Sequence, residues 1–136
     1  MALVPTVLIF EYFSGGGCPA GRLPEGLAAE AFGMLWAVLQ DFMDWGAVRT
    51  VTALDARFEQ IIPHLSRNTL PADEVYAALP GDHESVYLSL LKRCEAVLVI
   101  APETDGILTT LTELAEVEGK RLIGSSSTAT ATAGNK

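Results

Sequence analysis

TVLIFEYFSGGG, at residues 6–17, is the stretch that predicts the fold. A continuous apolar run that ends abruptly in glycines is typical of a strand that is buried on both faces and leads into a wide turn. The stretch AVLVIAPETDG, at residues 96–106, repeats this order of apolar strand and polar turn. In an open α/β sheet, ligands bind outside the carboxyl ends of the strands. We therefore expect the two turns to be neighbours at one crevice.

The rest of the chain alternates between strand and helix patterns. Apolar or β-branched runs predict strands at 4–10, 48–53, 74–79, 96–101 and 121–124. Apolar positions at helical spacing predict helices at 24–45, at 83–93 and from 104 or 105 to 118, with a short helical piece near 58–65. This alternation predicts an α/β domain with a Rossmann-like, open parallel sheet of about five strands and helices on both faces, in three layers.

Residues at the ends of the predicted helices fit this assignment. Pro24 and Glu25 suit the first turn of the first helix, and Gly46 is a typical helix stop. Asp82 can cap the helix that follows it. We assign 1–124 to the Rossmann-like domain. Residues 125–136 contain no large apolar side chain and are interpreted as a linker or a tail.

Composition limits the class of protein. The chain has 136 residues, of which 49% are hydrophobic, which is enough for one compact domain. A net charge of −8 argues against nucleic-acid binding. No apolar run is long enough to span a bilayer, and the start lacks the pattern of a secretory signal. Two cysteines, Cys18 and Cys94, form no ligand cluster, so we expect a reduced, cytoplasmic protein without a metal site.

The first turn supplies one set of candidate substrate-binding residues. These are Glu11, Ser14, Gly15, Gly16 and Gly17. Glu11 follows an apolar run in which an ionised side chain would be costly to bury, so we expect it at the solvent-exposed end of the strand. The glycines read either as a mobile turn or as a loop whose backbone approaches a ligand closely. The loop also matches G-x-G-x-x-A, but the late helix start does not fit a dinucleotide site.

The second turn supplies the other candidates, which are Glu103, Thr104, Asp105 and Gly106. Capping of the following helix by Thr104 or Asp105 would explain these two residues without a ligand. Glu103 can instead meet an amine or a hydroxyl group of a substrate. We expect no catalytic nucleophile, because Ser14 lacks a G-x-S-x-G context. His64 and His83 are isolated, and Asp55 is expected at the same rim as the two turns.

Four segments together resemble a known family. The residues at 10–17, 101–108, 124–126 and 135–136 are similar to the amino-terminal, pre-ATP-grasp domain of ATP-grasp ligases, most of all to the tyramine–glutamate ligase group associated with methanofuran-type cofactor synthesis. The resemblance implies that this domain forms one wall of the crevice that binds the substrate. It also implies that further lobes of the parent protein bind ATP and magnesium and activate a carboxylate as an acyl phosphate for attack by an amine.

From this resemblance we expect the chain alone to lack ligase activity and to need no cofactor. Its expected partners are an amine or amino-acid-like substrate and the ATP-grasp lobes of the parent protein. Two alternatives remain open. One is a freestanding flavodoxin-like module that binds a nucleotide or an anion. The other is an interaction domain that forms a homodimer through its first helix or an exposed sheet edge.

Overall fold

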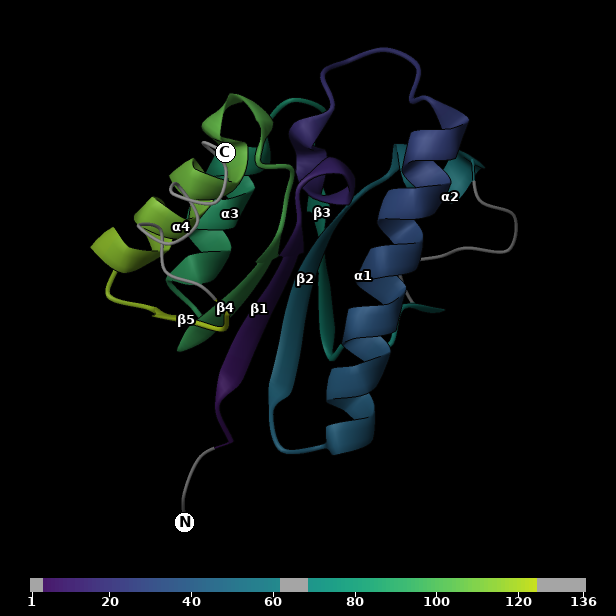
Figure 1. Cartoon of the computed structure of the whole chain (residues 1–136). Coiled ribbons are helices and arrows are strands. Elements are labelled where there is room, and N and C mark those ends of the chain that lie inside the picture. Colours follow the sequence, from purple (N-terminus) through teal and green to yellow (C-terminus); the bar gives the residue numbers. More distant parts are fainter. Residues whose placement is uncertain (1–3, 62–68, 125–136) are drawn as a thin grey trace.

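The computed structural model describes residues 4–61 and 69–124, which form a five-stranded parallel sheet (Figure 1). The strands follow the spatial order β3-β2-β1-β4-β5. Their bounds are β1 (Thr6–Glu11), β2 (Arg49–Asp55), β3 (Glu74–Ala78), β4 (Ala96–Ile100) and β5 (Arg121–Leu122). The predicted open, parallel, Rossmann-like sheet is confirmed, and each strand ends within two residues of its predicted carboxyl end.

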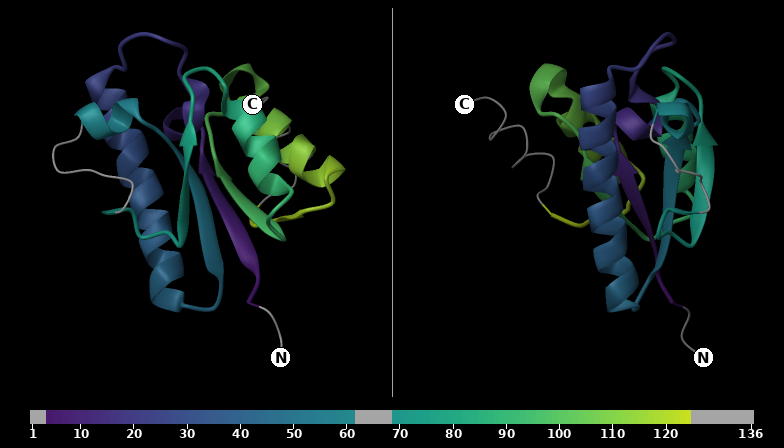
Figure 2. Two further views of the ribbon diagram at one scale, coloured as in Figure 1. Left: turned by 180° about the vertical axis from the view of Figure 1, so that it is seen from behind. Right: turned by 90° about the vertical axis from the view of Figure 1, so that its right-hand side faces the viewer.

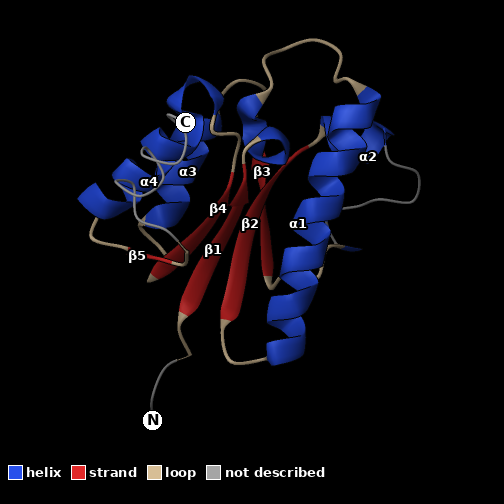
Figure 3. Ribbon diagram, in the orientation of Figure 1, coloured by secondary structure: helices blue, strands red, loops and turns tan. Residues whose placement is uncertain are grey.

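Helices cover both faces of the sheet (Figures 2 and 3). α1 (Glu25–Trp45) and α2 (Arg57–Ile61) lie on one face, and α3 (His83–Leu91) and α4 (Ile107–Val117) lie on the other. Two apolar cores result, one on each side of the sheet. Along β1, Val7 and Ile9 enter the α1 core, whereas Leu8 and Phe10 enter the α3 and α4 core. The apolar run of β1 therefore has no solvent-facing side, as its sequence predicts.

The ends of the helices differ in part from their predicted caps. Gly46 ends α1 as predicted: its φ is 71°, and its amide donates to the Phe42 carbonyl at 3.0 Å. Asp82 precedes α3, but its side chain makes no capping hydrogen bond. Among the described residues, no helix is both long and apolar enough to cross a membrane. The predicted tail at 125–136 and His64 lie outside the described residues.

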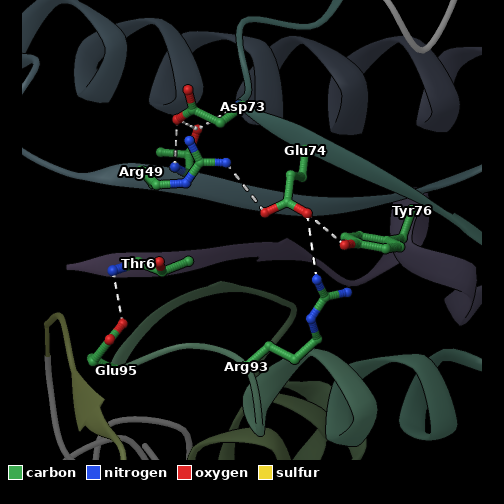
Figure 4. A network of polar contacts seen from close by, with 8 residues as sticks. Thr6, Arg49, Asp73, Glu74, Tyr76, Arg93 and Glu95 are labelled. Carbon is green, nitrogen blue, oxygen red and sulfur yellow. Dashed lines mark hydrogen bonds and ion pairs between the residues drawn. The ribbon is translucent and has the colours of Figure 1, made fainter. Parts of the chain in front are cut away.

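The amino ends of the strands are joined by polar side chains (Figure 4). Glu74 accepts hydrogen bonds from the hydroxyl of Tyr76 at 2.6 Å, from Arg49 at 3.4 Å and from Arg93 at 3.5 Å. The Tyr76 hydrogen bond is the main reason why the pKa of Glu74 is lowered. On β1, the Thr6 amide donates to a carboxylate oxygen of Glu95 at 2.7 Å. These contacts tie the amino ends of neighbouring strands together.

Candidate functional site at the carboxyl rim of the sheet

The turns after β1 and β4 leave the sheet side by side. Glu11 at the end of β1 pairs with Ile100 at the end of β4, and the Tyr12 amide donates to the Ile100 carbonyl at 2.8 Å. β1 has β2 on its other side, so the direction of chain progression reverses between β1 and β4. Such a switch point is where open α/β sheets bind their ligands. The predicted juxtaposition of the two turns is therefore confirmed.

Glu11 is buried, contrary to the expectation that it lies at a solvent-exposed strand end. Glu11 is only 1% exposed, and its carboxylate accepts hydrogen bonds from the amide and the hydroxyl of Ser14 at 2.6 and 2.7 Å. The Phe13 amide donates to its second oxygen at 3.1 Å. These bonds satisfy the free amides at the start of the helical turn η1 (Phe13–Gly17), which is why an acid is tolerated here. Burial nevertheless raises the pKa of Glu11.

The glycine turn is a packed helical turn. Ser14, Gly15 and Gly16 are buried, and Gly17 is partly exposed. Gly16 has a φ of 99°, and a Cβ atom added there would lie 2.8 Å from the Leu79 carbonyl oxygen. Glycine is thus required because the backbone passes close to the end of β3 in a left-handed conformation. Of these residues, Gly17 is the one with partial exposure to solvent.

Arg57, which the sequence analysis did not single out, holds the chain that follows this turn. Its Nε and Nη2 atoms donate to the Asp55 carboxylate, the Nη2 contact being 2.6 Å. Nη2 also donates to the carbonyl of Cys18, and Nη1 donates to the carbonyls of Pro19 and Gly21, at 2.7–2.8 Å. All five N–H groups of the guanidinium therefore have acceptors. Asp55 lies at the rim as predicted, but it is 1% exposed and its carboxylate forms an ion pair with Arg57.

The second turn is open to solvent. Glu103, Thr104, Asp105 and Gly106 are all exposed, and residues Thr104–Gly106 form a short 3-10 turn, η3, before α4. The predicted capping by Thr104 or Asp105 is wrong: Gly106, with a φ of 69°, precedes the helix, and no side chain caps it. Asp105 itself has a φ of 57°, a strained backbone for a residue other than glycine. Within the described residues, Glu103 and Asp105 have no hydrogen bond or ion pair, so their carboxylates are available.

Tyr12 and His83 lie on the same rim. Their rings meet edge to face, with centroids 4.8 Å apart. Burial raises the pKa of Tyr12, and the charges of Cys18 and Asp105 raise it further. His83 begins α3, and burial lowers its pKa. Its Nδ1 atom is buried and has no hydrogen-bond partner among the described residues. His83 is therefore a rim residue, and only the fold brings it to Tyr12.

The rim thus combines neutral hydrogen-bonding groups with free acids. Tyr12 and His83 can donate or accept hydrogen bonds, and Glu103 and Asp105 can accept from an amine or a hydroxyl group. Within residues 4–61 and 69–124, no group of three or more His, Cys, Asp or Glu side chains is arranged to hold a metal ion. The arrangement therefore suits recognition of a polar, cationic small molecule.

Two of three comparisons relate the chain to known proteins. The model of the pre ATP-grasp 3 domain family matches residues 48–130. The crystal structure of a protein from Archaeoglobus fulgidus, assigned to the ATP-grasp superfamily, superimposes with a TM-score of 0.64 at 25% sequence identity. The match covers 93% of this chain and 35% of that chain, so this chain spans about a third of the length of that protein. A comparison with curated proteins finds no match.

Proposed function

We propose a function from one premise: this chain belongs to the pre ATP-grasp 3 domain family. In our proposal the chain is the amino-terminal, substrate-side domain of an ATP-dependent carboxylate–amine ligase. The likeness to an ATP-grasp superfamily protein about three times as long supports this assignment. The lobes that bind ATP and magnesium would then belong to other parts of a longer protein.

The observation that carries the proposal is the pair of free carboxylates on the second turn. Glu103 and Asp105 are exposed on the turn after β4. Tyr12, whose amide donates to Ile100 at the end of β4, and its ring partner His83 lie at the same switch point of the sheet. A protonated amine is attracted by two carboxylates and can complete hydrogen bonds to both. We therefore propose an amine or an amino-acid-like molecule as the ligand of this rim.

The other predicted site residues have distinct roles in this proposal. Thr104 and Gly106 are exposed and contact the ligand together with the two acids. On the first turn, Gly17 offers its backbone to the ligand. The buried residues Glu11, Ser14, Gly15 and Gly16 act from beneath by fixing the shape of that turn. None of these residues is proposed to be catalytic.

The residues of this rim do not fit ATP with magnesium. The guanidinium of Arg57 is saturated by internal acceptors, and the amides of Ser14 and Gly17 donate within the first turn. The available side chains, Glu103 and Asp105, would repel a triphosphate. We therefore assign no nucleotide step to this chain. Its part in amide formation is to hold and orient a substrate for lobes that carry out the activation.

The resemblance to the tyramine–glutamate ligase group narrows the proposal. In that case the amine is tyramine, the acid is glutamate, and the product belongs to methanofuran-type cofactor synthesis. Tyr12 and His83 would then lie beside the aromatic ring of the amine. We also propose a cytoplasmic location, which the two free thiols of Cys18 and Cys94 support.

Titration of the ¹⁵N-labelled chain with tyramine tests the proposal. We expect amide shift changes at Tyr12, His83, Ala101 and residues 103–106, and binding weakened roughly tenfold by Glu103→Gln combined with Asp105→Asn. Glu113→Gln is the matched control, because Glu113 is an exposed acid on α4 outside the rim. Glutamate, phosphate and AMP serve as further probes. Shift changes by phosphate or AMP at the glycine turn, with none by tyramine, would favour a freestanding anion-binding module instead.

A further inference from the structure

One face of the sheet is covered by helices over only part of its width. On this face α1 and α2 lie over β1, β2 and β3, and their core also includes Ala96 and, in part, Leu98 of β4. Both later helices cover the opposite face (Figures 1 and 3). Among the described elements, no helix lies over β4 and β5 on the α1 side. Val97 and Val99 of β4 pack toward α3 and α4. Because side chains alternate along a strand, Leu98 and Ile100 point to the α1 side, and both are only partly buried.

The flank of α1 beside this region carries a second row of apolar side chains. Its members follow one another at spacings of seven, four and seven residues and therefore share one stripe of the helix: Leu27, Met34, Val38 and Trp45. α1 runs antiparallel to β1, and its right-handed turn aims this stripe toward β4, away from α2. Met34 is 42% exposed and Trp45 is 65% exposed. Ile123, just beyond β5, adds a side chain that is 37% exposed.

We call these residues of α1, together with Leu98, Ile100 and Ile123, the α1–β4 surface. Large apolar side chains gathered in this way mark an interaction site more often than a free surface. The segment at 125–136 contains only Ser, Thr, Ala, Gly, Asn and Lys, so it has no large apolar side chain with which to fill the surface. The occupant must come from another polypeptide segment.

The charge of α1 selects the occupant. Its four charged residues are all acidic: Glu25, Glu30, Asp41 and Asp44. By helical spacing, Glu30 and Asp41 border the apolar stripe on its solvent side. If a second copy packed its α1 antiparallel against this stripe, Glu30 of each copy would face Asp41 of the other copy. Opposed like charges disfavour such a dimer, and they also disfavour an anionic membrane.

We propose that the α1–β4 surface binds a basic amphipathic protein helix. The apolar side of that helix covers the stripe of α1 and the partly buried side chains of Leu98 and Ile100. Its lysines or arginines meet Glu30 and Asp41 at the margin of the surface. This is the helix-in-groove mode of recognition, with apolar contacts for affinity and charge for selection. The surface lies on a face of the sheet and the rim site lies at its carboxyl edge, so the two can be tested separately.

Two synthetic helical peptides of about 18 residues, long enough to span the stripe, test this proposal. Both carry the same leucine stripe, and their polar faces carry lysine in one peptide and glutamate in the other. We expect the lysine peptide alone to bind the 136-residue chain, with a blue shift of Trp45 emission, and salt to weaken binding. Met34→Lys should weaken binding roughly tenfold or more. Val117→Lys is the control of equal charge, because Val117 is 84% exposed on α4.

The circular dichroism spectrum and the urea midpoint establish that both variants are folded. Equal binding of the glutamate peptide would refute the charge selection. Equal effects of Met34→Lys and Val117→Lys, or no binding of either peptide, would refute the site itself. A concentration-dependent dimer that Met34→Lys abolishes, detected by sedimentation, would identify a second copy as the occupant and overturn the proposal.

Discussion

Replacing Arg57 by alanine should destabilise the chain more than any other change of a single basic residue among those described. The guanidinium donates to the buried carboxylate of Asp55 and to the carbonyls of Cys18, Pro19 and Gly21. Alanine leaves Asp55, at 1% exposure, with the amide of residue 57 as its remaining donor among the described residues. Removing one partner of a buried ion pair costs about 3–5 kcal/mol of stability. Because the Arg57 side chain is 17% exposed, we expect a value near the lower end of this range.

We therefore expect Arg57→Ala to lower the free energy of unfolding by about 3 kcal/mol and Tm by about 10 °C. Arg57→Lys should recover about half of the loss, because an ammonium group keeps the charge but lacks the planar fork of five donors. Urea denaturation followed by circular dichroism measures both. Arg22→Ala is the control: its side chain is 87% exposed and its ion pair with Glu25 spans 3.5 Å. If Arg57→Ala and Arg22→Ala differ by less than about 1 kcal/mol, the assigned role of Arg57 is wrong.

Two further changes probe the first turn. Gly16→Ala should lower the free energy of unfolding by about 2 kcal/mol or more, because φ is 99° and the added Cβ would lie 2.8 Å from the Leu79 carbonyl oxygen. Gly33→Ala is the control, since Gly33 lies within α1 with open space around it. This change should leave the free energy of unfolding unchanged or raise it by up to about 1 kcal/mol. A loss of equal size in both variants would contradict the packed turn. Burial raises the pKa of Glu11 above 4.5, so the folded chain holds this proton more tightly than the unfolded chain. The stabilisation that Glu11 contributes is complete below its ordinary pKa and is lost as pH rises through its raised pKa in the folded chain. Glu11→Gln should therefore remove this pH dependence from the urea midpoint. An unchanged pH dependence in the variant would contradict the role assigned to Glu11.

The fold was predictable because it depends on local patterns that repeat along the chain. Residues 7–10 of β1 and all of β4 are apolar, which suits strands covered on both faces. Gly46 ends α1 for a reason internal to the helix, since glycine readily adopts the left-handed conformation. The short α2 was predicted from Phe58, which is fully buried, although its extent beyond Ile61 lies outside the described residues.

The place where the two turns meet was predictable, whereas the surroundings of their residues were predictable only in part. Sequence order places the turns after β1 and β4 at the carboxyl edge of a parallel sheet, and the exposed Glu103 and Asp105 lie there. The expectation for Glu11 was wrong because the donors that stabilise this buried acid, the amides of Phe13 and Ser14, come within reach only when the turn folds back. Arg57 gave no signal, since its three carbonyl acceptors lie 36–39 residues away in the chain.

The amino-acid sequence by itself determined the order of strands and helices, the parallel sheet and the rim at which two turns meet. These follow from hydrophobic periodicity and backbone preference, which act between near neighbours in the chain. Only the tertiary structure decided which polar groups face inward, that Tyr12 meets His83, and that Leu98 and Ile100 of β4 remain only partly buried among the described residues. Burial and hydrogen bonding between distant residues depend on distances in space, and a linear pattern does not contain them.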